Sequence, residues 1–310
     1  MDFWNLAIRI IFLSQIIIGI LGNVSLLFYY LVLYYREFTL KSTELILMHL
    51  MVANIIIIFS AGVPQTMTIW GMKQFLNDFG CKLLLYIHAV GRSVSICTTC
   101  LLSVFQAMTI RPQKFCGNDH KVTMERYLGC FISFLWVLYF LVNFIFLVYT
   151  YIKKNSNNET RKRDFGYCST VGSDKISDSL YATLVMCPEV FFSVLIAWSS
   201  GSMIVILYRH KQKVKYIYST HVSRRDYPES RATQNILAQM FTFLAFYTLS
   251  STLRGSIALL SNHSWWLMNI NHFTSLCFPS FGPFVLMSHY SIVSRFILFW
   301  LRKNCSNFLL

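Results

Sequence analysis

Ionisable side chains lie inside long apolar runs of this 310-residue chain, where a charge is costly. Arg92 follows Cys81 by eleven residues, about 16 Å along a helix that rises about 1.5 Å per residue. His88 precedes Arg92 by four residues, so the two side chains share one helix face. An arginine near the middle of a bilayer is a functional-site hypothesis by default, so this face is a candidate ligand site.

Glu189 is the only acidic residue deep within a predicted helix. If that helix starts near Ser179, Glu189 lies about 15 Å from its start and level with Arg92. Two interpretations stay open: the two side chains line a polar ligand pocket, or they form an internal ion pair that fixes the packing. Arg254 is a further candidate, which either extends to the outer membrane interface or contacts the ligand.

Other polar residues within the apolar runs have structural interpretations. Cys97 and Cys100 form a C-x-x-C pair without further zinc ligands, so we interpret both as packing residues. Asn23, Asn54 and Ser95 are of the kind that joins membrane helices by hydrogen bonds. The sequence contains no H-E-x-x-H, no G-x-S-x-G and no phosphate-binding loop. We therefore expect no enzyme, no metal site and no cofactor.

The elements that position these residues are long apolar segments. The chain is 55% hydrophobic and only 13% charged, about half the charged fraction of ordinary soluble domains. We predict an all-α membrane protein, a single seven-transmembrane helix bundle over residues 1–310, with a short amphipathic helix near 290–302 on the inner leaflet. A membrane helix needs about 20 apolar residues, and the predicted helices lie near 7–34, 44–70, 82–110, 127–150, 179–208, 233–260 and 267–289.

The distribution of Lys and Arg predicts how the bundle is oriented. These residues are more numerous in the loops that are cytoplasmic when the N-terminus is outside. That excess favours an N-out/C-in arrangement. The net charge of +14 is concentrated on these short loops. Membrane lipids with anionic head groups and an acidic cytosolic protein explain it better than nucleic acid does.

Cys81 and Cys168 both lie outside the membrane in this orientation, where thiols tend to pair. We expect a disulfide that pins the long outer loop over the bundle, and the alternative is two unpaired cysteines. Asn158 begins an N-E-T sequon on the same loop, so we expect it to be glycosylated.

Seven helices, an outside N-terminus and a third-helix cysteine paired with the second outer loop describe a G-protein-coupled receptor. The chain departs from the rhodopsin-like group, because Phe105-Gln106-Ala107 stands where that group has Asp-Arg-Tyr and Asn54 where a sodium-binding aspartate is usual. With these departures the sequence resembles the vomeronasal type-1 pheromone receptor family. The most specific match is the third-helix run TTCLLSVFQA at 98–107, and the others are 49–54, 109–112, 200–203, 209–212, 228–233 and 279–286.

The resemblance implies a chemosensory receptor of the plasma membrane in vomeronasal sensory neurons. It would bind small pheromone-like molecules in the outer half of the bundle and activate an inhibitory-type heterotrimeric G protein. His88 and Arg92 could hold an anionic head group there. The residues expected to face the G protein are Gln106, Arg111, Arg209, Lys211 and Arg231. The alternatives are a bitter taste receptor and, from a different class, a membrane channel or transporter.

Overall fold

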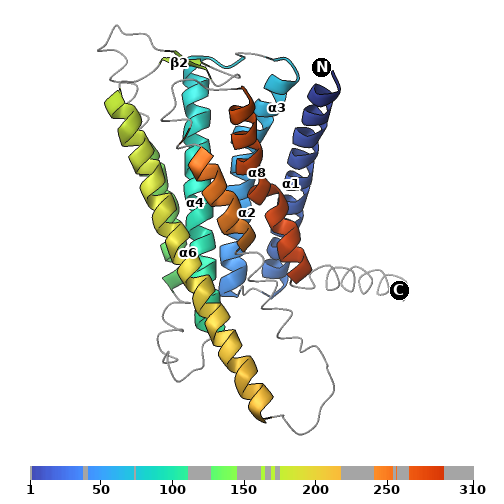
Figure 1. Cartoon of the computed structure of the whole chain (residues 1–310), viewed down its shortest axis with the longest axis vertical. Coiled ribbons are helices and arrows are strands. Elements are labelled where there is room, and N and C mark those ends of the chain that lie inside the picture. The colour runs from blue at the N-terminus through green and yellow to red at the C-terminus, as the bar shows by residue number, and fades with distance from the viewer. Residues whose placement is uncertain are drawn as a thin grey trace.

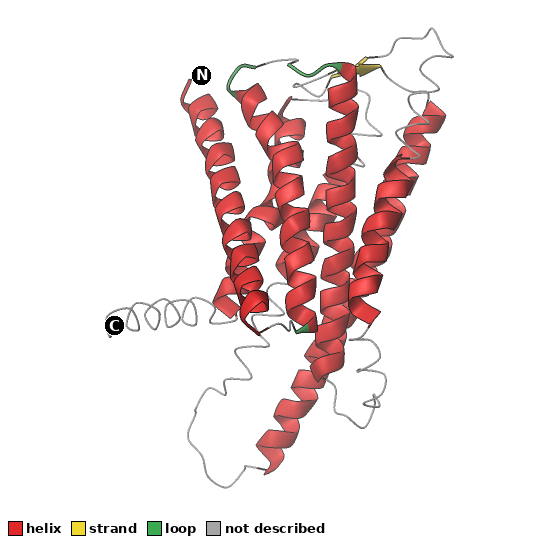
Figure 2. Ribbon diagram, turned by 180° about the vertical axis from the view of Figure 1, so that it is seen from behind, coloured by secondary structure: helices red, strands yellow, loops and turns green. Residues whose placement is uncertain are grey.

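The computed structural model describes residues 2–37, 41–72, 75–110, 127–144, 162–164, 169–171, 175–217, 241–253, 256 and 265–289. Within these residues the chain is helical apart from one short two-stranded sheet. The helices lie side by side along one direction (Figures 1 and 2). Five of the described helices are long and apolar enough to cross a membrane.

The helices follow the order of the predicted apolar runs. The first two runs form α1 (Asp2–Glu37) and α2 (Ser42–Ile57), and α2 continues through the π-helical segment η1 (Ile58–Gly62) into α3 (Val63–Ile69). The remaining helices are α4 (Asp78–Ile110), a helix over Tyr127–Phe144, α6 (Lys175–Ile217), an apolar helix over Phe241–Leu253, and α8 (Trp265–His289). The all-helical membrane prediction is thus supported. The count of seven spans and the orientation stay predictions.

Helix α6 differs most from its predicted range of 179–208. It runs for 43 residues, about 65 Å at about 1.5 Å per residue. The hydrocarbon core of a bilayer is about 30 Å thick, so α6 is longer than a membrane span requires. Figure 1 shows its C-terminal part projecting beyond the ends of the neighbouring helices.

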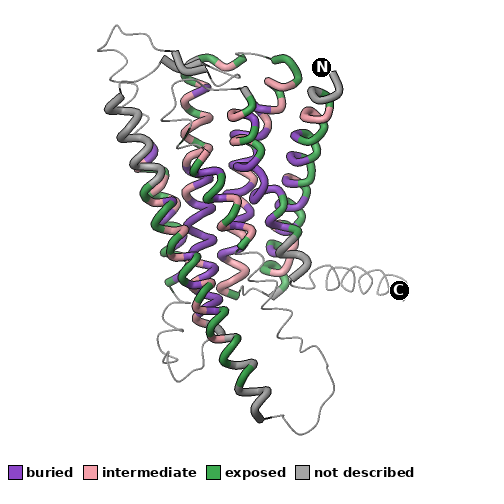
Figure 3. Tube along the Cα trace, viewed as in Figure 1, coloured by how far each residue is buried: buried purple, intermediate pink, exposed green. Residues whose placement is uncertain are grey.

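Helices α2 and α4 form the centre of the bundle. Helix α2 packs against α1, α4 and α8, and α4 also packs against α6. Buried residues gather on the inward faces of these helices (Figure 3). The largest apolar cluster joins α1, α2, α4, α6, α8, the helix Tyr127–Phe144 and the helix Phe241–Leu253, through side chains that include Leu26, Met51, Ile96, Ile132, Ile196, Phe243 and Phe278.

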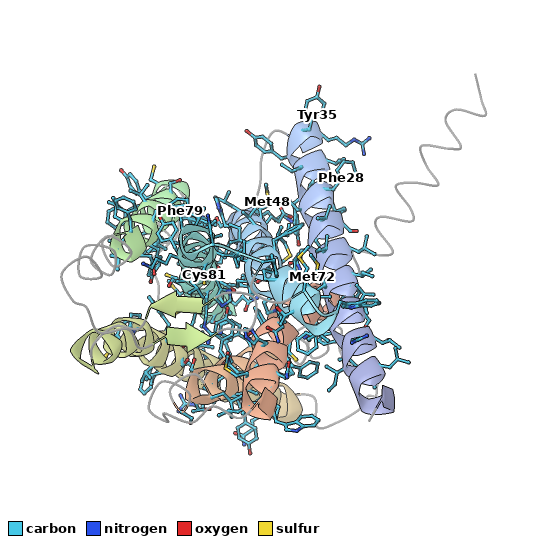
Figure 4. The ribbon with its side chains drawn as sticks, turned by 90° about the horizontal axis from the view of Figure 1, so that it is seen from above. Phe28, Tyr35, Met48, Met72, Phe79 and Cys81 are labelled. Atoms are coloured by element: carbon cyan, nitrogen blue, oxygen red, sulfur yellow. The ribbon has the colours of Figure 1, made fainter. Side chains whose placement is uncertain are left out.

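The outward faces of the helices are apolar as well. Phe28 and Tyr35 lie in the C-terminal half of α1, where Figure 4 labels them, and both are exposed. Trp198 on α6 and Phe241 at the start of the helix Phe241–Leu253 are also exposed. A helix that is apolar on its exposed face suits a lipid environment. The described helices therefore have the surface of membrane spans.

Candidate functional site

Arg92 and Glu189 meet in the interior of the bundle. Arg92 lies on α4 and Glu189 on α6, and their exposed fractions are 3% and 5%. The guanidinium Nε donates to Glu189 Oε1, and Nη2 donates to Glu189 Oε2 at 3.2 Å. The contact is therefore a two-point pair, the geometry that makes arginine–carboxylate pairs strong and directional. Of the two interpretations that the sequence leaves open, the ion pair is formed in the structure.

A third helix completes the cluster. Ser250 and Ser251 belong to the helix Phe241–Leu253, and both are buried. Arg92 Nη1 donates to Ser250 Oγ at 2.9 Å, and Arg92 Nη2 donates to Ser251 Oγ at 3.0 Å. Ser251 Oγ in turn donates to Glu189 Oε2. The site thus joins α4, α6 and the helix Phe241–Leu253 through one hydrogen-bond network.

An aromatic group lies beneath the guanidinium. The Arg92 Cζ atom is 4.8 Å from the centroid of the Tyr247 ring, within the range of a cation–π contact. The Tyr247 ring lies 4.2 Å from that of Phe243, and the Phe243 ring lies 4.4 Å from that of Phe278 on α8. The ring that contacts Arg92 therefore belongs to an aromatic group that two helices supply.

The pair carries no net charge when both groups are ionised. Arg92 and Glu189 are the buried charged residues within the part of the chain that the structure describes. Their donors and acceptors are met by each other and by the two serines. Removing one partner of such a buried pair leaves the other uncompensated, which costs about 3–5 kcal/mol.

His88 lies one turn away from Arg92 on α4 but contacts a different helix. Its Nδ1 is 3.5 Å from Ser60 Oγ, and Ser60 belongs to the π-helical segment η1. Single π-helical turns inside α-helices are frequent at functional sites. His88 therefore connects the neighbourhood of the ion pair with the π-helical continuation of α2.

A second polar cluster joins the other side of the bundle. Asn54 Nδ2 donates to Asn23 Oδ1 at 3.1 Å, and Ser95 Oγ donates to Asn54 Oδ1 at 3.3 Å. Asn23 Nδ2 also donates to the Pro279 carbonyl at 2.8 Å. These bonds connect α1, α2, α4 and α8, as expected for polar residues that join membrane helices.

The N-terminal end of α4 lies near the sheet. Strand β1 (Lys162–Asp164) pairs antiparallel with β2 (Ser169–Val171), and β2 lies against α4. Cys81 is fully buried and disulfide-bonded, and Figure 4 shows it close to the two strands. The predicted partner Cys168 lies outside the described residues, so the identity of the partner stays a prediction.

At the opposite end of α4, Gln106 is buried with an exposed fraction of 4%. On α6, Arg209 is exposed. The side chain of Lys211 is not described, and five further predictions fall outside the described residues: Arg111, Asn158, Arg231, Arg254 and the amphipathic helix near 290–302.

The sequence indicated the pair as one of two interpretations, but it did not indicate the serine and tyrosine partners. A signal was present, because Ser250 and Ser251 are adjacent hydroxyls in an apolar run and lie three and four residues after Tyr247. Residues at that spacing lie on one helix face. The described residues include no group of acidic residues, histidines and cysteines that could hold a metal ion.

These features define a helical membrane protein with a charge-neutral polar site inside its bundle. The chain belongs to the vomeronasal type-1 receptor family, because residues 6–299 match the model of the vomeronasal organ pheromone receptor family. Its relatives are receptors and not enzymes, as the sequence predicted. The match favours the predicted vomeronasal type-1 receptor over the two alternatives, a bitter taste receptor and a membrane channel or transporter.

Human relatives match along nearly the whole chain. Vomeronasal type-1 receptor 2 of Homo sapiens is 45% identical over 292 residues, which cover 94% of this chain and 74% of that protein. Vomeronasal type-1 receptor 4 of Homo sapiens is 45% identical over 290 residues, covering 94% of this chain and 96% of that protein. Vomeronasal type-1 receptor 3 of Homo sapiens is 43% identical over 292 residues, covering 94% of this chain and 93% of that protein.

Proposed function

We propose that this chain is a G-protein-coupled receptor that binds small pheromone-like molecules and activates an inhibitory-type heterotrimeric G protein. Its single domain over residues 1–310 would form seven transmembrane helices with the N-terminus outside. The receptor would act in the plasma membrane of vomeronasal sensory neurons. Family membership supports a chemosensory receptor, and the position of the Arg92–Glu189 pair supports the location of the ligand site.

The buried Arg92–Glu189 pair is the observation that carries the proposal. An ionisable pair inside membrane-length helices is costly and marks a functional site by default. The pair lies where α4, α6 and the helix Phe241–Leu253 converge. A ligand bound here would meet charged and polar groups from several helices at once, and the proposed ligand-binding residues are His88, Arg92, Glu189 and Arg254.

A ligand at this site acts by binding one packing of the helices better than another. Arg92 is already bonded to Glu189 and the serines, so an anionic ligand group must share or replace the Glu189 carboxylate. That exchange would change how α4 and α6 are held together. Ligand binding and helix rearrangement are thereby linked at one place.

The proposed G-protein surface lies at the other end of α4 and α6. Gln106 is buried here, so it would reach a G protein only after the helices separate. Arg209 is exposed in the C-terminal part of α6. Arg111, Lys211 and Arg231 would add to its positive charge. An opening that uncovers Gln106 beside this basic surface suits an acidic cytosolic partner.

The outer end would be held by a Cys81–Cys168 disulfide and would carry a glycan at Asn158. Cys81 is disulfide-bonded and lies at the start of α4 beside the sheet. Strand β2 begins one residue after Cys168 in the sequence and contacts α4, the helix that carries Cys81. This arrangement supports the proposed pairing.

The experiment that tests the function is a ligand screen on the expressed full-length receptor. A panel of urinary small molecules and sulfated steroids is applied to cell membranes, and nucleotide exchange is measured on purified inhibitory and stimulatory G proteins. We expect exchange only with the inhibitory class and only with part of the panel. The proposal would be contradicted if the panel stimulated nucleotide exchange on neither class of G protein, or on the stimulatory class alone.

Two variants test the location of the site. Arg92→Ala and Glu189→Ala should each lower ligand potency at least tenfold at equal surface expression. Thr252→Ala is a matched control, because Thr252 is exposed and its hydroxyl bonds only its own helix, to the Leu249 carbonyl at 2.8 Å. Unchanged ligand responses in both site variants would place the ligand elsewhere.

A further inference from the structure

The helix Phe241–Leu253 makes two kinds of hydroxyl contact. Thr248 and Thr252 donate to carbonyls of their own helix at 2.7 and 2.8 Å and are exposed. Ser250 and Ser251 are buried and reach across to α4 and α6. Serine and threonine hydroxyls in helices commonly bond the preceding turn of their own helix. Ser250 and Ser251 differ, because their hydroxyls bond side chains of other helices.

Ser251 occupies the central place in this arrangement. Its Oγ accepts a hydrogen bond from Arg92 Nη2 and donates one to Glu189 Oε2. The hydroxyl therefore bonds both members of the ion pair, one as acceptor and one as donor. A movement of either charged group relative to the helix Phe241–Leu253 must lengthen one of these bonds.

We infer that Ser250 and Ser251 are positioning residues that hold the helix Phe241–Leu253 against the Arg92–Glu189 pair. A ligand group that bonds Arg92 or Glu189 competes with the serine hydroxyls and releases this helix. This inference rests on the proposed function, because it places the switch at the proposed ligand site. It adds the step by which occupancy of the site moves a third helix.

Two other contacts of this helix near the pair are less directional. Tyr247 contacts the guanidinium through its ring face, and Phe243 packs in the apolar cluster. Stacking and apolar packing tolerate small displacements better than a hydrogen bond, whose strength falls steeply as its geometry worsens. The two serine hydroxyls are therefore the more directional of these contacts and restrict the position of the helix most closely.

Alanine variants of the two serines test this inference in the full-length receptor. Ser250→Ala, Ser251→Ala and the double variant are compared with Thr248→Ala and Thr252→Ala, which remove hydroxyls from the exposed face of the same helix. Ser251→Thr keeps the hydroxyl and serves as the conservative variant. The first readout is basal nucleotide exchange per receptor at the cell surface, without added ligand.

The second readout needs neither a ligand nor a G protein. Hydrogen exchange is measured on the purified receptor in peptides that cover residues 241–253. We expect the double variant to exchange about tenfold faster there, with a rise of similar size in basal activity. Tenfold corresponds to about 1.4 kcal/mol, close to the lower end of the range for one hydrogen bond to a charged group. The threonine controls should match the unmodified receptor, and Ser251→Thr should restore slow exchange.

The two readouts separate the inference from the proposed function. Faster exchange without activation of any G protein would support the positioning role and contradict the proposed function. Unchanged exchange in a receptor that still responds to ligand would overturn the positioning role alone. If the double variant does not reach the surface, the single variants decide by the same measurements. Lower thermal stability with unchanged exchange and basal activity would show a merely structural role and would also overturn the inference.

Discussion

Breaking the ion pair one partner at a time should destabilise the receptor far more than replacing both partners together. Arg92→Met leaves Glu189 as a buried carboxylate without its cation, and Glu189→Met leaves Arg92 as a buried cation without its carboxylate partner. Each single variant should lose about 3–5 kcal/mol. At about 2 °C per kcal/mol for a large domain, the melting temperature should fall by about 6–10 °C.

The double variant Arg92→Met/Glu189→Met should recover most of this loss. Methionine approximates both side chains in length and fills irregular space. Replacing both members of a buried pair by apolar residues is often neutral or stabilising. The serine hydroxyls do not become stranded, because each can turn back to a carbonyl of its own helix, as Thr248 and Thr252 do.

The assay is thermal unfolding of the solubilised full-length receptor. Arg209→Met is the matched control, because it removes an exposed cation from α6 and should change the melting temperature by about 1 °C or less. The difference between the double variant and the sum of the singles is the coupling energy of the pair. Additive losses would show that the two charges do not stabilise each other, and the reasoning about the site would then be refuted.

Three further predictions concern the frame around the site. Cys81→Ser should reduce surface delivery, and Cys81→Ser/Cys168→Ser should show no further loss in surface labelling if these two residues form the bridge, whereas additive defects would contradict the pairing. Gly19→Val should lower the melting temperature by several degrees, because a Cβ atom there would lie 2.7 Å from Ser280 Oγ; an unchanged melting curve would contradict this close packing. Asn54→Leu should cost about 1–3 kcal/mol by removing two interhelical hydrogen bonds, and a melting temperature within about 1 °C of the unmodified receptor would argue against that network.

The similar depth of Arg92 and Glu189 in the bundle could be predicted from spacing alone. Both lie a similar distance along lipid-length helices, and a bilayer aligns such helices, so equal depth brings the groups level. The rise of about 1.5 Å per residue was sufficient for this step. Whether the level groups would bond each other depended on the rotation of α4 and α6 about their axes, which depth along the helix does not define.

The undefined rotation of a membrane helix about its axis also explains why the roles of Ser250 and Ser251 were not predicted. In a water-soluble helix a polar residue marks the exposed side, but in an apolar membrane helix a serine can face lipid or the interior. Thr248 and Ser251 are three residues apart, yet one is exposed and the other buried. Only tertiary packing separates them.

The length of α6 had a different cause. Hydropathy ends the predicted span near residue 208, where basic and polar residues begin. The helix continues to Ile217 because lysine, arginine and glutamine have good helix propensity in water. Apolar content reports where the membrane ends, whereas backbone hydrogen bonding determines where the helix ends.

The charge balance of the cluster connects ligand selection with helix release. A neutral ligand can bond a serine hydroxyl or a lone pair of Glu189 without disturbing the ion pair. An anionic ligand gains Arg92 only by weakening its bonds to Glu189, and that carboxylate is also bonded to Ser251. Under the proposed mechanism, an anionic ligand would therefore weaken the contact of Arg92 with Glu189, whereas a neutral ligand would leave that ion pair in place. Among ligands of equal affinity, the anionic ones should then be the more efficacious agonists, and Glu189→Gln should reduce that difference because it removes the competing charge.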